Sequence, residues 1–177
     1  MLAHSPPFPL VVDYCDGDRF HSEKDVERIL LALEQPNRIR RIRVDSFLED
    51  LQQFVMAIDD GLPNLEYLAL GARNVGDDAT LVFPETVQTP HLRHLVLMGV
   101  APPIGSRLLT TATGIVTLHL FMDDSSTYLN PNSLLQWISC LPQLETLIIA
   151  AFPDRRAEMQ LFDMPTVTHP TFPNLRL

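Results

Sequence analysis

Two arginines, Arg41 and Arg43, are the residues whose type and spacing most suggest binding chemistry. If they lie on a strand, both side chains point to the same face, because side chains alternate along a strand. Two neighbouring guanidinium groups can hold a carboxylate or a phosphate through paired hydrogen bonds. The alternative is a solvated edge strand whose charges discourage pairing with other strands. The sequence leaves both interpretations open.

Two further groups of residues could suggest a metal site, but their spacing argues against one. His91 and His94 bracket the start of a predicted strand, where positions three apart face opposite ways, and no nearby Cys or carboxylate completes a zinc set. An acidic turn near the N-terminus departs from the spacing of a calcium loop; it comprises Asp13, Asp16, Asp18 and Glu23. We interpret both groups as surface polar residues and predict no metal and no cofactor.

The two cysteines, Cys15 and Cys140, lie far apart in sequence and form no disulfide framework, which favours a reducing compartment. Cys15 lies near His21, but nothing supplies the orienting third group that a catalytic thiol needs. We expect Cys140 to be packed in the core. The chain contains neither a G-x-S-x-G motif nor a glycine-rich phosphate loop. These observations predict no catalytic residue, and hence not an enzyme.

The formal net charge is −9 and the pI is about 5.0, which disfavours nucleic acid as a partner. The one basic cluster, at positions 38–43, is short and lies among acidic neighbours. The N-terminal residues do not resemble a signal peptide, and no apolar run approaches the ~20 residues that span a bilayer. We therefore expect an intracellular protein, cytoplasmic or nuclear, that binds no membrane.

A short apolar pattern, L-x-x-L-x-L with Ile or Val allowed, recurs along the chain. Its copies begin at Ile39, Leu65, Leu92, Ile115 and Leu144, and a sixth begins at Leu175 and is cut off at Leu177. Successive copies begin 26, 27, 23, 29 and 31 residues apart, close to the ~20–29-residue period of leucine-rich repeats. The pattern predicts one leucine-rich-repeat domain over residues 1–177, with about five complete repeats and a truncated sixth.

Prolines mark the start of most copies. Four copies have a proline two residues before their first leucine, at Pro63, Pro90, Pro142 and Pro173, whereas the copy at Ile115 has Thr113 and Gly114 instead. Because proline cannot continue a helix, it separates each preceding segment from the strand that follows. No regular Asn or Cys ladder follows the strands, so the turns must be stabilised in another way.

The segments between the strands return the chain. We predict helices at three places: after Ser22, after a capping box made by Ser46 and Glu49, and after Asn130 and Pro131. A shorter helical turn is expected over residues 106–111, a loop over 71–89, and an extra strand over 8–14. Alternation of strands and return segments indicates parallel strands.

Stacked units of this kind form a solenoid of the α/β class, an open horseshoe with parallel strands on its concave face and helices and loops on its convex face. The leucines point inward, and the residues between them point to the concave face. The candidate partner contacts on that face are Arg41, Arg43, Tyr67, His94, Thr117, His119 and Thr146.

The chain resembles the repeat region of fungal F-box/leucine-rich-repeat proteins of the basidiomycete type. The resemblance rests on Pro-Pro-Phe-Pro-Leu-Val-Val-Asp-Tyr at 6–14, the helix over 23–33, Leu-Pro-Asn-Leu-Glu-Tyr-Leu-Ala-Leu at 62–70, Asn-Pro-Asn-Ser-Leu-Leu-Gln-Trp at 130–137 and Leu-Pro-Gln-Leu-Glu-Thr-Leu-Ile-Ile at 141–149. It implies a protein-binding module that recognises targets for a ubiquitin ligase, with an F-box that binds the ligase adaptor.

The chain departs from that family in two ways. We find no F-box before the first predicted strand, and the last copy stops within the motif, so we expect a fragment or a truncated gene product. The alternative to a ligase receptor is a scaffold or a truncated decoy that has no link to a ligase. The adaptor would be a partner only if an F-box lies upstream.

Overall fold

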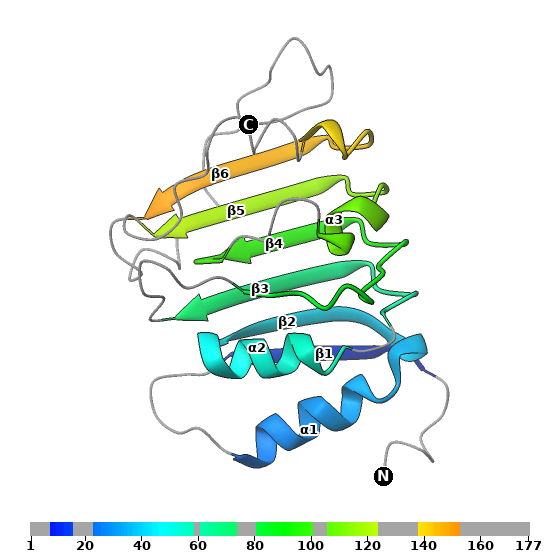
Figure 1. The fold of residues 1–177 in the computed structure, drawn as a ribbon, viewed down its shortest axis with the longest axis vertical. Coiled ribbons are helices and arrows are strands. Elements are labelled where there is room, and N and C mark those ends of the chain that lie inside the picture. Colours follow the sequence, from blue (N-terminus) through cyan, green and yellow to red (C-terminus); the bar gives the residue numbers. More distant parts are fainter. Residues whose placement is uncertain are drawn as a thin grey trace.

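The computed structural model describes residues 8–15, 23–58, 61–73, 81–100, 106–123 and 138–152. Its elements are β1 (Leu10–Cys15), α1 (Glu23–Leu33), the 3-10 helix η2 (Pro36–Arg38), β2 (Ile39–Phe47), α2 (Leu48–Met56), β3 (Tyr67–Arg73), β4 (His94–Met98), α3 (Arg107–Thr111), β5 (Thr117–Asp123) and β6 (Thr146–Phe152). The six strands form one sheet in which every neighbouring pair is parallel, and their order follows the chain (Figure 1). The prediction of an α/β fold with parallel strands is confirmed.

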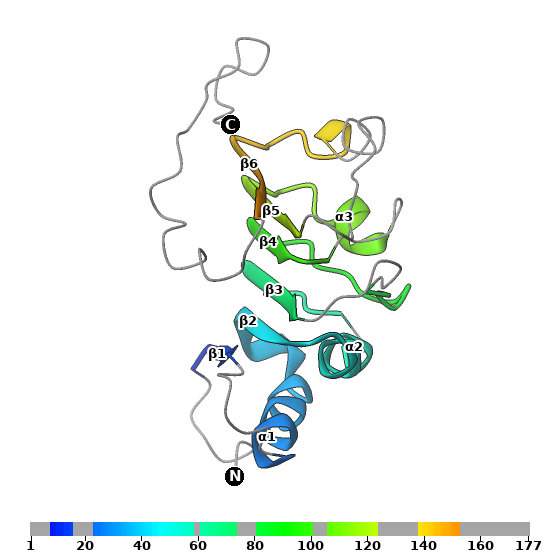
Figure 2. The same cartoon turned by 90° about the vertical axis from the view of Figure 1, so that its left-hand side faces the viewer.

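This strand order explains where the helices lie. Connections between parallel strands are almost always right-handed, so a sheet whose order never reverses receives all its return segments on one side. In Figure 2, α2 and α3 lie on the same side of the sheet, and α1 packs at its β1 end. None of the helices in the described ranges is long and apolar enough to cross a membrane.

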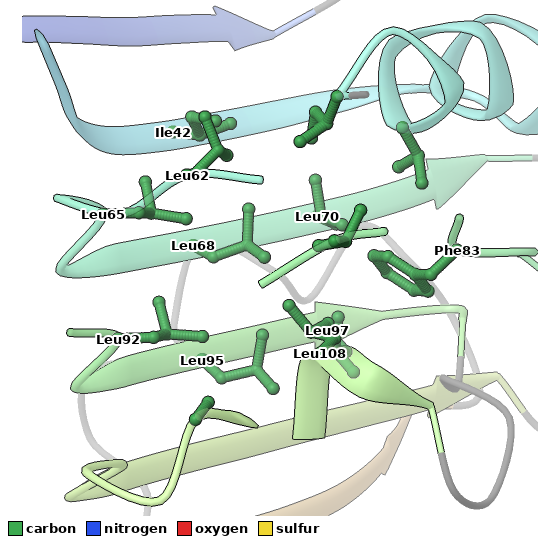
Figure 3. Packing of buried hydrophobic residues seen from close by; sticks show 14 of the residues in the cluster. Ile42, Leu62, Leu65, Leu68, Leu70, Phe83, Leu92, Leu95, Leu97 and Leu108 are labelled. Carbon is green, nitrogen blue, oxygen red and sulfur yellow. The ribbon is translucent and has the colours of Figure 1, made fainter. Parts of the chain in front are cut away.

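The core lies between the sheet and these return segments, and the repeated leucines form it. The first apolar residue of the copies at Ile39, Leu65, Leu92 and Ile115 is fully buried, and Leu144 is 8% exposed. The second and third positions stack in further rows, as Leu68 beside Leu95 and Leu70 beside Leu97 show in Figure 3. Burying one such side chain stabilises the fold by about 1.5–3 kcal/mol. A register slip by one residue would turn a whole row to the other face, so these rows set the register.

Each of the later strands is preceded by a tight turn. The amides of Leu65, Leu92 and Leu144 donate to the carbonyl three residues earlier at 3.1–3.2 Å, and the proline occupies the second position of the turn. Proline suits that position because its ring holds φ near −65°. The amide of Ile115 makes the same bond to Ala112 without a proline. The prolines therefore act by shaping the turn that leads into each strand.

The turns of successive copies are joined by side-chain hydrogen bonds. Asn64 donates from Nδ2 to the carbonyl of Asn37 at 2.7 Å. One copy later, His91 donates from Nδ1 to the carbonyl of Pro63 at 2.6 Å. Each donor lies one residue before the first apolar residue of its own copy, and each acceptor lies two residues before the first apolar residue of the preceding copy. We call these two bonds the turn ladder. In the next copy the donor position is Gly114, whose Cβ, if it had one, would lie 4.0 Å from the carbonyl oxygen of Pro90.

Two local predictions are wrong. Ser46 does not cap α2, whose N-cap is Phe47 and lacks a side-chain cap bond. Strand β2 continues through Ser46, which pairs with Ala72 and is fully buried, and its hydroxyl donates to Asp50 at 3.3 Å. Cross-strand pairing thus overrides the local capping signal. Cys140 is exposed rather than packed in the core, because the next residue, Leu141, takes the buried position.

The loop predicted over 71–89 starts too early, because β3 continues through Arg73 by pairing with β2. The remaining predicted elements agree with the structure where it describes them. Helix α1 spans the predicted range, α3 falls within 106–111, and β1 begins and ends within two residues of the predicted extra strand. The predicted cap Ser22 and the segment Asn130–Trp137 lie outside the described residues.

Candidate interaction surface

The side of the sheet opposite α2 and α3 carries three rows of side chains, one residue from each strand, and we call this surface the open face. The first row is Val11, Arg41, Tyr67, His94, Thr117 and Thr146. The second row is Asp13, Arg43, Ala69, Val96, His119 and Ile148. The third row is Cys15, Asp45, Gly71, Met98, Phe121 and Ala150. All seven predicted contact residues lie in the first two rows, and their role in binding stays a prediction.

The first row brings a cation and two rings together. The guanidinium carbon of Arg41 lies 4.2 Å from the centroid of the Tyr67 ring. On the next strand, the His94 ring lies 6.3 Å from the Tyr67 ring. A guanidinium stacked on an aromatic face keeps its N–H donors free at its edges. Tyr67 therefore orients Arg41 without occupying its hydrogen-bonding groups.

The arginines of β2 and β3 differ in what neutralises them. Arg40 forms an ion pair with Glu66, and Arg73 forms one with Asp45. Within the described ranges, no carboxylate forms an ion pair with Arg41 or Arg43, and both residues are exposed. Strand β2 is also paired on both sides, with β1 and β3. The interpretation of Arg41 and Arg43 as charges on an edge strand is therefore wrong.

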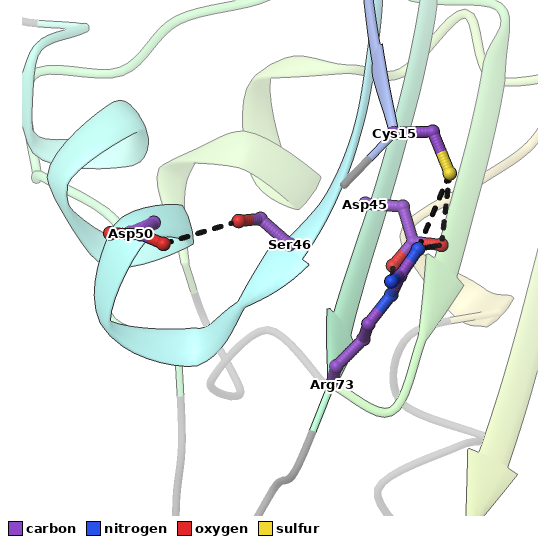
Figure 4. A network of polar contacts seen from close by, with 5 residues as sticks. All are labelled: Cys15, Asp45, Ser46, Asp50 and Arg73. Atoms are coloured by element: carbon purple, nitrogen blue, oxygen red, sulfur yellow. Dashed lines mark hydrogen bonds and ion pairs between the residues drawn. The ribbon is translucent and has the colours of Figure 1, made fainter. Parts of the chain in front are cut away.

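Cys15 and Asp45 of the third row form a polar cluster with Arg73, which lies two residues beyond that row on β3 (Figure 4). Arg73 reaches both carboxylate oxygens of Asp45, from Nε at 3.0 Å and from Nη2 at 3.1 Å. Cys15 Sγ lies 3.8 Å from Asp45 Oδ2 and 3.3 Å from Arg73 Nη2. Burial, followed by the Asp45 charge, raises the pKa of Cys15, although Arg73 and Arg43 oppose this shift. The thiol is thus held neutral, which is the opposite of an activated nucleophile.

Gly71 allows this cluster to close. A Cβ at this position would lie 2.9 Å from Met98 Cε and 3.2 Å from Asp45 Cγ. Sequence reasoning missed the ion pair of Asp45 and Arg73, which are 28 residues apart. The alignment of the copies carries a signal for this pair. It places Arg73 opposite Phe47, which lies two residues beyond Asp45 on β2, so the long arginine side chain can reach the carboxylate.

The open face becomes less charged toward β5 and β6. The His119 ring packs edge-on against Phe121 with 6.0 Å between centroids. Burial, with a smaller effect from His94, lowers the pKa of His119. Neighbouring second-row residues are the aliphatic Val96 and Ile148. The face therefore offers cations at β2, whereas at β4–β6 it combines the polar first row of His94, Thr117 and Thr146 with aliphatic side chains in the second row.

The two histidines of the sequence motif have separate surroundings. His91 bonds to the turn carbonyl of Pro63, whereas the His94 ring lies beside Tyr67. Across the described residues, no group of three or more His, Cys, Asp or Glu side chains could hold a metal ion. His21 and two of the four residues of the acidic turn, Asp16 and Asp18, lie outside the described residues.

No protein-family model matches the chain, and the comparisons with curated proteins and with solved structures gave no match either.

Proposed function

We propose that this chain is a leucine-rich-repeat solenoid that recognises another protein through its open face. In this arrangement the strands line the concave side and the helices and loops lie on the convex side. The proposal is supported by the sequential parallel sheet, the recurring turn before each strand and the stacked rows of leucines. Each copy packs on its neighbours, as expected for stacked repeats.

One observation carries the functional part of the proposal. Arg41 and Arg43 lie side by side on a face that the described return segments do not cover, and Tyr67 orients one of them. Arg and Tyr, together with Trp, are enriched among the residues that anchor protein interfaces. Two exposed guanidinium groups, one of them oriented by Tyr67, have little to contribute to the stability of the sheet itself, so a partner is the better explanation.

The resemblance to F-box/leucine-rich-repeat proteins makes the partner a target for ubiquitylation. In this proposal the repeats hold the target, and the ligase adaptor binds an F-box elsewhere in the native product. A scaffold or decoy would hold the same partner without marking it for degradation. A ligase receptor therefore leads to ubiquitylation of the bound protein, whereas a scaffold or decoy does not.

A photo-crosslinking amino acid tests the proposal when it is placed at Thr117 on the open face and, as a control, at Thr110 on α3. The chain is expressed in the cells from which it comes, and proteins attached after irradiation are identified by mass spectrometry. We expect discrete adducts from position 117 that are absent from position 110. Charge reversal by Arg43→Glu should remove them, whereas Arg107→Glu on the helical side should not.

Equal adducts from both positions, or none from position 117, would remove the support for recognition through the open face. Ubiquitin on the attached protein, and its accumulation when the proteasome is inhibited, would support the ligase role. An attached protein that shows neither change would favour the scaffold or decoy. Mapping the 5′ end of the native transcript tests separately whether an F-box is encoded upstream.

A further inference from the structure

Building on the proposed function, we propose that the open face binds an extended anionic segment of the partner protein, with two acidic side chains at alternate positions that engage Arg41 and Arg43. The shared chemistry is a carboxylate or a phosphorylated side chain on a protein strand. The inference rests on which charges are neutralised within the sheet, on their spacing and on how one of them is held.

Among the described residues of β2 and β3, the charge balance leaves Arg41 and Arg43 for a ligand. Arg40 and Arg73 are each paired with a carboxylate, and Asp45 is neutralised by two contacts from Arg73. Arg41 contacts the face of the Tyr67 ring, so the edges of its guanidinium remain available. A pair of available guanidinium groups attracts an anion, and charge-assisted hydrogen bonds are about twice as strong as neutral ones.

The spacing of the pair selects the form of the ligand. Arg41 and Arg43 are two residues apart on β2, which places their backbones about 6.6–6.8 Å apart. Alternate residues of any extended segment have the same separation and point to the same side. An extended segment that runs alongside β2 can therefore place one anion on each arginine. Two adjacent acidic residues would instead point to opposite sides.

One neighbouring charge opposes this ligand and provides an internal test. Asp13 pairs in register with Arg43, is exposed, and belongs to no ion pair among the described residues. Its carboxylate would repel an incoming anion and compete for Arg43. Removing that charge should therefore strengthen binding, which a merely structural role for Asp13 would not predict.

The test uses the full chain and synthetic peptides as probes. The first peptide is Ser-Thr-Glu-Thr-Glu-Thr-Ser, and its isomer Ser-Thr-Thr-Glu-Glu-Thr-Ser has the same charge with adjacent acids. A third peptide carries phosphothreonine in place of each alternating Glu, and an oligouridine tests nucleic acid. Binding is followed through the Nε–H signals of the arginine side chains in nitrogen-15 NMR spectra, and the backbone amide signals report whether each variant is folded.

We expect the alternating peptide to shift the signals of Arg41 and Arg43 and to bind about tenfold more tightly than its isomer. Arg41→Gln and Arg43→Gln should each weaken binding about tenfold, and Arg107→Gln should leave it unchanged. Asp13→Asn should strengthen binding, Tyr67→Leu should weaken it, and raising NaCl from about 50 mM to about 500 mM should weaken it. If the phosphothreonine peptide binds more tightly than the alternating glutamate peptide, the anion of the partner is a phosphorylated side chain.

Equal affinity for the two isomers, no effect of Arg43→Gln, or preferred binding of oligouridine would overturn this inference. The proposed function would survive that result if the crosslinks from Thr117 still depended on position. If the peptides bind as expected but no position-dependent crosslink forms, the anion site would stand and the proposed recognition of a partner through the wider face would fall.

Discussion

Replacing Gly114 by asparagine should stabilise the protein, because it would extend the turn ladder by one bond. The ladder joins Asn64 to the carbonyl of Asn37 and His91 to the carbonyl of Pro63. Gly114 occupies the equivalent donor position but has no side chain to donate. A Cβ there would lie 3.7 Å from the nearest atom and 4.0 Å from the carbonyl oxygen of Pro90, both ordinary contact distances.

The magnitude follows from two separable contributions. The φ of Gly114 lies outside the left-handed region, so a side chain can be added without backbone strain. Replacing such a glycine by alanine stabilises a protein by about 0.4–1 kcal/mol through the unfolded state. A new neutral hydrogen bond adds about 0.5–1.5 kcal/mol. Gly114→Asn should therefore raise the free energy of unfolding by about 1–2.5 kcal/mol, and Gly114→Ala by about 0.4–1 kcal/mol.

Urea unfolding followed by circular dichroism measures both variants. The reverse change, Asn64→Ala, removes an existing bond of the ladder and should lower the free energy of unfolding by about 1 kcal/mol. If Gly114→Asn proves no more stable than Gly114→Ala, while Asn64→Ala is destabilising, the equivalence of the turns is refuted. If Asn64→Ala is also neutral, the bonds of the ladder do not stabilise the fold.

Three further results are expected. Leu97→Ala should lower the free energy of unfolding by about 2–5 kcal/mol, whereas Ile149→Ala, at the equivalent position but 38% exposed, should cost less than about 1.5 kcal/mol; urea unfolding measures both. Because burial lowers the pKa of His119 in the folded state, the unfolded chain takes up a proton more readily as the pH falls. The stability from neutral His119 is therefore complete above about pH 6.5 and is lost below it, and His119→Gln should reduce the pH dependence of unfolding. Asp45→Asn should speed the alkylation of Cys15 by iodoacetamide near pH 7.5, because it removes a charge that raises the pKa of the thiol; the rate is measured by mass spectrometry with the other cysteine replaced by serine.

Each of these three predictions can be contradicted by a specific result. If the substitutions at Leu97 and Ile149 lower the free energy of unfolding equally, β6 is as well covered as β4 at the centre of the sheet. A pH dependence that His119→Gln leaves unchanged would assign the titration to another group. Slower alkylation after Asp45→Asn would mean that this carboxylate helps to form the thiolate.

The sequence alone determined the place of each strand along the chain, its direction and its register, but not where β2 and β3 end. The apolar pattern beginning at Leu65 and at Leu92 specifies which side chains point inward, because alternation along a strand is a local property. The same alternation is enough to place Arg41 and Tyr67 on one face of the sheet. Prolines such as Pro90 marked the turns, because the restriction on φ acts within a single residue.

Only the tertiary structure decided which charges of the sheet remain available to a ligand. Arg73 is neutralised by Asp45 and Arg40 by Glu66, while Arg43 is left without an ion pair among the described residues. Local periodicity says where a side chain points, but neutralisation depends on partners 26–28 residues away that are brought into contact by the stacking of one copy on the next. The buried place of Ser46 has the same cause, since pairing with a neighbouring strand outweighed the local preference of a serine for a helix cap.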